Sequence, residues 1–190
     1  MSALASFLGL SRWGRHERAG FTLYGTAVAA AREPYLYTTI GVPDTLDGRF
    51  DLVGLHAFLL IRRLQRESGP GAAPDAALAQ AVFDAMFSDM DINLRELGVG
   101  DMTVGKRVRA MWEAFHGRSA AYAAAMAETG QAPLAAALAR NIWRGESPPE
   151  GAAETLARLV RAQDAYLADQ QSGALARGEA RFLPAEAACQ

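Results

Sequence analysis

Apolar residues recur three and four positions apart along almost the whole chain, which is the spacing of helices that bury one face. The first predicted helix covers residues 15–32 and ends before Pro34, because proline cannot continue a helix. The second predicted helix follows Asp47 and Gly48. Since it is apolar almost all round over residues 52–64, we expect it at the centre of a bundle.

Two further helices are predicted before the C-terminal third. A linker rich in glycine and proline, residues 69–74, separates the second helix from a third over residues 75–97. Gly98 suits the left-handed position that follows a helix. Asp101 or Thr103 is predicted to cap a long fourth helix.

The remaining periodic segments complete an all-α fold. Two C-terminal helices are predicted, and no segment alternates as a strand would. The pattern predicts a single irregular bundle of six to seven helices, with its last helix packed against the second and fourth. Residues 19–172 form the predicted helical domain, between an N-terminal segment, residues 1–18, that is flexible or docks on a surface, and a C-terminal tail, residues 173–190. The two C-terminal helices are predicted over residues 133–143 and 150–171.

Composition narrows the class of protein. With 51% hydrophobic and 21% charged residues over 190 positions, the chain suits one globular domain. A net charge of −2 gives no reason to expect nucleic acid as a partner. The single cysteine, Cys189, excludes an internal disulfide and favours a reducing compartment, the cytoplasm. Nowhere in the sequence is there a stretch of roughly 20 apolar residues that could cross a bilayer.

Three patterns resemble metal or nucleotide sites, and each lacks a required part. Residues 100–107 match the start of a phosphate-binding loop but have Arg107 where Ser or Thr must bind magnesium. Asp89 and Asp91 imitate the start of a calcium loop without its glycine or terminal glutamate. Glu113 and His116 form one half of a di-iron motif, and the sequence has no second half. The sequence therefore predicts neither a catalytic residue, nor a cofactor, nor a metal, and the protein is not expected to be an enzyme.

Two charged, glycine-punctuated strings stand out, residues 39–58 and 83–108. Their turns hold far more charge than a connection between helices needs, and charged turns on a rigid scaffold usually serve recognition. Arginine and aromatic side chains are frequent anchors of interfaces. The predicted partner-binding residues are Asp44, Asp47, Arg49, Phe50, Asp89, Asp91, Arg95, Lys106 and Arg107. An internal pair of Arg49 with Asp89 or Asp91 is the alternative.

These two strings, with the following segment MWEAFHGRSAAY, resemble the ubiquinol-cytochrome c reductase assembly chaperone family, in the form of its bacterial single-domain members. The resemblance extends from about Ala19 to about Met126. It implies a non-enzymatic assembly factor that binds newly made cytochrome b, or another membrane-protein client, at the inner face of the membrane. In a eukaryote this would be the matrix side of the mitochondrial membrane.

Two other classes of function stay open at this point. Helices two, three and four could enclose a small-ligand or metal site near His56 and Tyr37, as in a metal-dependent helical enzyme. The chain could instead be a structural adaptor that forms a homodimer through its C-terminal helix. A groove with charged rims would suit the chaperone, because its client presents apolar helices and basic loops.

Overall fold

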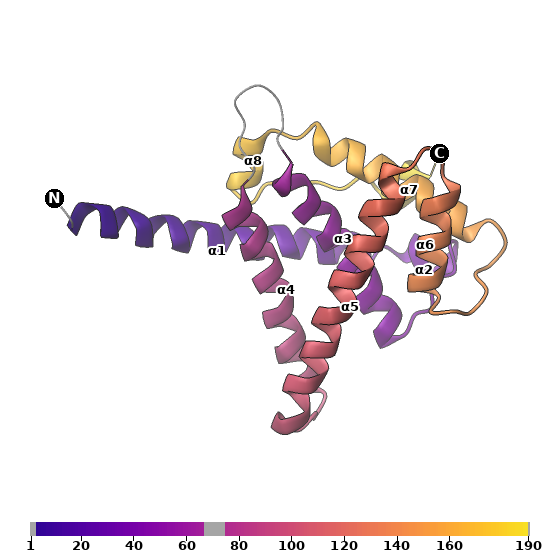
Figure 1. Ribbon diagram of the computed structural model, residues 1–190, viewed down its shortest axis with the longest axis horizontal. Helices are drawn as coiled ribbons and strands as arrows, with labels where there is room; N and C mark the ends of the chain where they lie inside the picture. The colour runs from indigo at the N-terminus through magenta and orange to yellow at the C-terminus, as the bar shows by residue number, and fades with distance from the viewer. Residues whose placement is uncertain (1–2, 67–74, 190) are drawn as a thin grey trace.

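The computed structural model describes residues 3–66 and 75–189 and, within them, the side chains from Gly14 onward except that of Arg15. These residues confirm the predicted all-α fold (Figure 1). Among the described residues, six long helices form an irregular bundle. Of three short helices, α2 lies between α1 and α3, and α8 and α9 follow α7. The long helices are α1 (Ala3–Ala31), α3 (Leu46–Gln65), α4 (Ala76–Glu96), α5 (Asp101–Ala127), α6 (Ala132–Ile142) and α7 (Ala152–Ala168). The short ones are α2 (Pro34–Thr38), α8 (Ser172–Ala176) and α9 (Ala185–Ala188).

Helix α3 lies at the centre of the bundle, as its sequence predicts. It contacts α1 and α4 as well as α5, α6 and α7. Leu52, Leu59 and Leu60 are fully buried along it. Because each such side chain contributes roughly 1.5–3 kcal/mol on burial, α3 supplies much of the driving force for folding.

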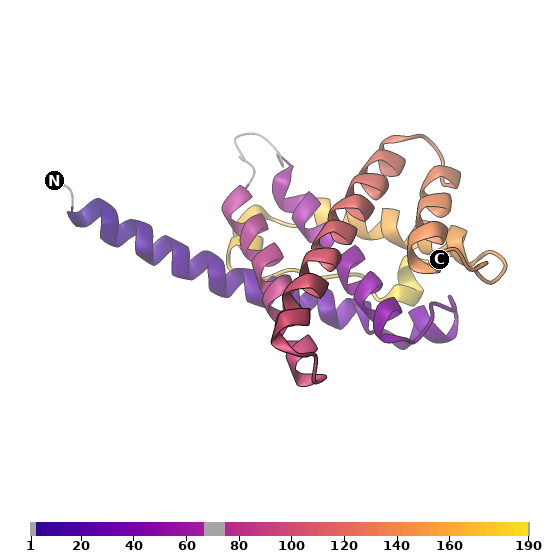
Figure 2. The same ribbon diagram turned by 60° about the horizontal axis from the view of Figure 1, so that its bottom comes forward.

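The C-terminal half of α1 packs closely against α4. At Gly20 an added Cβ would lie 2.7 Å from atoms of Ala81, so glycine permits the approach. Helix α1 begins at Ala3, and its N-terminal part extends away from the body in both views (Figures 1 and 2). The side chains of residues 3–13, on which the prediction of a docking segment depends, lie outside the described part, as do the linker residues 69–74.

Helices α4 and α5 form a hairpin that projects from the body (Figures 1 and 2). Asp75 caps α4 by accepting a hydrogen bond from the Leu78 amide at 3.0 Å. Gly98 has the predicted left-handed conformation, with φ of +78°. The N-cap of α5 is Gly100, so the prediction that Asp101 or Thr103 caps this helix is wrong. The turn ends one residue earlier than the polar side chains suggested.

The C-terminal helices pack back onto the body. Helix α7 lies mainly against α3 and α6, and Arg161 links it to the end of α5 by donating to the Met126 carbonyl at 3.4 Å. The segment predicted as a tail contributes buried residues, including Leu175 and Ala185. Within the described ranges, no helix combines the length and hydropathy needed to cross a bilayer.

Candidate functional site

An apolar groove lies where the start of α3 meets the α4–α5 hairpin. Its volume is about 360 Å³. The large apolar side chains that line this α3–α4–α5 groove are Leu46, Phe50, Met90, Leu94, Leu97 and Met111. Phe50, Met90 and Leu94 are buried and form its floor, whereas Leu46 and Leu97 are 62% and 61% exposed at its edge. Leu46 and Leu97 are therefore solvent-exposed beside a preformed apolar surface.

A buried aspartate fixes one wall of the groove. Asp51 on α3 accepts hydrogen bonds from Arg118 of α5 and from the Arg144 Nε, the latter at 2.7 Å. The Asp51 side chain is 0% exposed. Burial raises the pKa of this carboxyl, and the hydrogen bonds and charges of the two guanidiniums oppose that shift. The cluster ties α3, α5 and the connection between α6 and α7 together.

Sequence reasoning missed the three residues of this Asp51 cluster. Arg144 has φ of +53°, in the left-handed region that glycine usually occupies, and from there its Nη1 also donates to Asp47 at 2.8 Å. The available signal was Asp51 itself, a charged residue at the start of a helix that is otherwise apolar almost all round. Its partners Arg118 and Arg144 lie 67 and 93 positions away in the chain, a separation that helical periodicity does not bridge.

The predicted residues of the first string divide between surface and groove. Asp44 and Arg49 form an exposed ion pair, with the Arg49 Nε 2.6 Å from the carboxylate, and this hydrogen bond lowers the pKa of Asp44. The alternative pairing of Arg49 with Asp89 or Asp91 is therefore wrong. Phe50, which was predicted to bind a partner, is only 8% exposed and belongs to the hydrophobic core.

The predicted acidic residues of the second string have separate partners. Asp89 accepts a hydrogen bond from the Tyr24 hydroxyl of α1 at 2.7 Å. Asp91 pairs with Arg95 one helical turn later, and Arg95 also pairs with Asp101 across the turn. Within residues 3–66 and 75–189, no hydrogen bond or ion pair joins a predicted partner-binding residue of the first string to one of the second. The two strings are therefore not linked in the way that the alternative pairing of Arg49 required.

Lys106 and Arg107 lie exposed on the first turns of α5. Arg107 lines the α3–α4–α5 groove, and Lys106 does not. Neither has an ion-pair partner in the part of the chain that the structure describes. Of the nine predicted residues, Asp47, Phe50 and Arg107 therefore border the groove.

The groups considered for a metal or ligand site have separate partners. The buried His56 has its Nδ1 2.8 Å from the Leu52 carbonyl, and burial lowers its pKa to about 4. His116 stacks on Trp112 with ring centroids 4.0 Å apart, and Glu113 pairs with Arg109. Within the described residues, no group of three or more His, Cys, Asp or Glu side chains could hold a metal ion.

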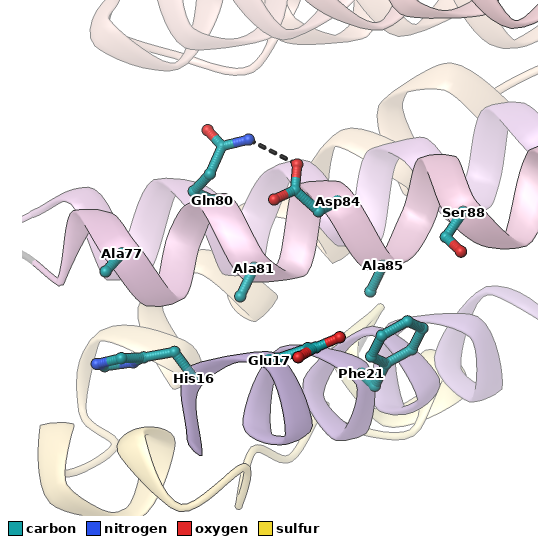
Figure 3. A pocket seen from close by; sticks show the side chains of 9 residues that line it. All are labelled: His16, Glu17, Phe21, Ala77, Gln80, Ala81, Asp84, Ala85 and Ser88. Carbon is teal, nitrogen blue, oxygen red and sulfur yellow. Dashed lines mark hydrogen bonds between the residues drawn. The ribbon is translucent and has the colours of Figure 1, made fainter. Parts of the chain in front are cut away.

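A second groove runs between α1 and α4 (Figure 3). His16, Glu17 and Phe21 of α1 face small side chains of α4 such as Ala81, and Gln80 donates to Asp84 at 2.7 Å along its edge. Phe21 is 47% exposed here. The residues that line this groove include no exposed aliphatic pair such as Leu46 and Leu97 of the α3–α4–α5 groove.

Comparison with known proteins identifies relatives along most of the chain. The sequence profile of the family described as ubiquinol-cytochrome C chaperone matches residues 38–182. The ubiquinol-cytochrome-c reductase complex assembly factor 1 of Xenopus laevis is 24% identical over 149 residues, which cover 78% of this chain and 72% of that protein. The crystal structure of the Cbp3 homolog from Brucella abortus is similar with a TM-score of 0.79 and 36% identity, covering 96% of this chain and 97% of that one.

These matches correct the extent of the resemblance. It was expected from about Ala19 to about Met126, but the family profile continues to residue 182 and the similarity to the Brucella abortus structure covers 96% of this chain. The C-terminal third, which the resemblance did not cover, contributes α6 and α7, and both helices contact α3. The chain belongs to the ubiquinol-cytochrome c chaperone family.

Proposed function

We propose that this protein binds newly made cytochrome b in its α3–α4–α5 groove and holds it while ubiquinol-cytochrome c reductase is assembled. Membership of the family gives the general role of a chaperone in the assembly of that complex. The choice of client, the groove as its binding site and a purely binding action are our proposal. The observation that carries it is the pair of exposed leucines, Leu46 and Leu97, above a buried apolar floor.

The chemistry of the groove fits an apolar helix of a membrane protein. Such a helix has no lipid around it before insertion, and burying each large apolar side chain stabilises a complex by roughly 1.5–3 kcal/mol. Amphipathic or apolar helices commonly bind in grooves of this kind. Asp47, Arg107 and Arg144 border the groove and can bind polar groups at the ends of the client segment.

The groove is held in shape before a client arrives. The Asp51 cluster joins α3 to α5, and the Thr45 hydroxyl caps the start of α3 by accepting from the Gly48 amide at 3.1 Å. Preorganisation of this kind reduces the entropy lost on binding. A chaperone needs such a binding surface but no catalytic residue, so we propose that the protein is not an enzyme.

The homodimeric adaptor receives less support than the chaperone. Leu156, Leu159 and Val160 form the apolar face of α7 and are fully buried inside the chain. A homodimer through that face would have to expose the core first. The proposed client also sets the proposed location, which is the cytoplasm or matrix beside the inner face of the membrane.

Replacing a groove-edge leucine with aspartate tests the proposal. Leu46→Asp or Leu97→Asp is expected to lower the cytochrome b that co-purifies with the tagged protein by at least about tenfold, because a charge would replace an apolar contact in the complex. Both side chains are more than half exposed, so the fold should persist by circular dichroism. Recovery is measured by quantitative mass spectrometry from membranes of the native organism.

Phe21→Asp is the matched control, because Phe21 is an exposed apolar side chain of the α1–α4 groove. It should leave recovery of cytochrome b unchanged. Equal recovery with all three variants, or an equal loss with Phe21→Asp, would contradict the assignment of the groove. Charge reversal at Asp91 tests the predicted polar positions more cleanly than reversal at Asp89, since Asp89 also bonds the buried Tyr24.

A further inference from the structure

We infer that the site which holds the C-terminal strap against α7 binds an extended segment of another polypeptide, and that the strap competes for this site within the same chain. The C-terminal strap consists of residues 178–185, which follow α8 and include Ala185, the first residue of α9. In Figure 1 the chain returns from α8 alongside α7. Other residues line the α3–α4–α5 groove, so this strap site is separate from the proposed client site.

Two glutamine side chains bind the backbone of the strap. Gln163 of α7, which is 1% exposed, donates to the Leu183 carbonyl at 2.7 Å and accepts from the Leu183 amide at 2.8 Å. Gln170, just after the end of α7, donates to the Arg181 carbonyl at 2.7 Å and accepts from the Arg181 amide at 3.0 Å. Each glutamine therefore satisfies both backbone groups of one strap residue, as a paired strand would.

A third contact continues the same spacing. The Ala185 amide donates to the carboxylate of Glu33, between α1 and α2, at 2.6 Å. Residues 181, 183 and 185 are two positions apart, which is the period at which an extended chain presents its backbone groups to one side. Since these contacts use the backbone, they do not depend on the identity of the three side chains. The site is therefore complementary to an extended segment in general.

Other positions of the strap add a requirement for particular side chains. The Phe182 ring contacts the buried His56 of α3 edge-on, with ring centroids 5.2 Å apart. Gly178 has φ of +85°, and an added Cβ there would lie 3.1 Å from the Cβ of Thr22 on α1. Ala185 is buried. The occupant that fits is an extended segment with a central aromatic residue, a glycine four positions before it and a small residue three positions after it.

The strap is held more by polar contacts than by burial of large side chains. Arg181 and Pro184 are exposed, and Phe182 and Leu183 are only partly buried. Residues 179–184 belong to no helix. A segment with few buried apolar contacts opens at a lower free energy than the core does. An internal segment that occupies a site lowers the apparent affinity for an external one in proportion to the fraction of sites left free.

Fluorescence anisotropy with the full chain tests the inference. The probe is a labelled synthetic peptide with the sequence of residues 177–189. The natural chain should bind it weakly, because its own strap competes. Phe182→Ala in the chain weakens the internal strap and should tighten binding of the peptide at least about tenfold. Arg181→Pro in the chain should also tighten it, because proline removes the amide that donates to Gln170 while the side chain replaced is exposed.

Changes in the peptide should have the opposite effect. Phe182→Ala in the peptide should weaken its binding to the Arg181→Pro chain at least about tenfold, because the contact with His56 is lost. A peptide N-methylated at the Leu183 amide keeps every side chain but cannot donate to Gln163. It should bind at least about fivefold more weakly than the parent peptide.

Phe21→Ala in the chain is the matched control, because Phe21 is an exposed aromatic residue of the α1–α4 groove. It should bind the peptide as weakly as the natural chain does, and circular dichroism checks that each variant is folded. The inference is overturned if neither strap variant of the chain binds the peptide more tightly than the natural chain. Equal tightening by Phe21→Ala, or unchanged binding of both altered peptides, would also overturn it.

Discussion

Asp51→Asn is expected to lower the free energy of unfolding by about 3 kcal/mol at pH 7. The substitution keeps the size of the side chain but leaves Arg118 and Arg144 facing a neutral amide. Removing one partner from a buried charge cluster costs about 3–5 kcal/mol, because the remaining charge is uncompensated. The lower end of this range applies here, since the Arg144 side chain is 41% exposed and its guanidinium can be hydrated in the variant. Denaturation in urea, followed by circular dichroism, measures the change.

Asp91→Asn is the matched control for this prediction. Asp91 also binds an arginine, Arg95, but their side chains are 38% and 50% exposed. Exposed pairs contribute about 0–1 kcal/mol, so the control should lose less than 1 kcal/mol. If Asp51→Asn lost no more than Asp91→Asn, the cluster would not be what holds α3 to α5. Because Phe50 precedes Asp51 and lies in the groove floor, Asp51→Asn should also reduce recovery of cytochrome b.

Acid is expected to destabilise the fold through His56 by about 3 kcal/mol between pH 7 and pH 4. The unfolded chain binds a proton at this imidazole near pH 6.5. Burial lowers the pKa of His56 in the folded protein to about 4. Between these values the unfolded state binds more protons than the folded state, so stability falls as the pH falls. Each unit of difference corresponds to 1.36 kcal/mol.

The variant His56→Gln isolates this contribution. Its loss of stability from pH 7 to pH 4, measured by urea denaturation at each pH, should be smaller than that of the natural protein by about 3 kcal/mol. A His56→Gln variant that lost stability as steeply as the natural protein would contradict the buried, neutral state of His56.

The positions of the long helices along the chain were largely predictable because hydrophobic periodicity is a local property. The packing of the last helix was not, since α7 lies mainly against α3 and α6 and not, as predicted, against α3 and α5. Helix α3 was correctly placed at the centre because only a central position can bury an apolar surface that extends all round a helix. The two ends of the hairpin turn differed in how well they were predicted. Gly98 was identified because the left-handed backbone conformation favours glycine. The N-cap of α5 was not identified, because several polar residues near the start of the helix were candidates for that position.

The candidate site was predicted less completely. The charged strings drew attention to α3 and to the hairpin, and three of their residues, Asp47, Phe50 and Arg107, border the groove. The pattern did not indicate that Arg49 binds its near neighbour Asp44, nor that Asp89 binds Tyr24 on α1. The sequence offers several possible partners for each charged side chain, and the packing of the helices determines which of them it binds.

By itself, the sequence determined that this protein is a helical bundle around α3, and the charged strings indicated its family. Helical periodicity and the helix-ending effects of proline and glycine depend on only a few neighbouring residues, so they can be recognised in the sequence alone. Only the tertiary structure decided that Leu46 and Leu97 line one groove, that Asp51 is held by Arg118 and Arg144, and that the α4–α5 hairpin projects from the body. These features depend on contacts between distant segments, and their geometry is fixed when the helices pack.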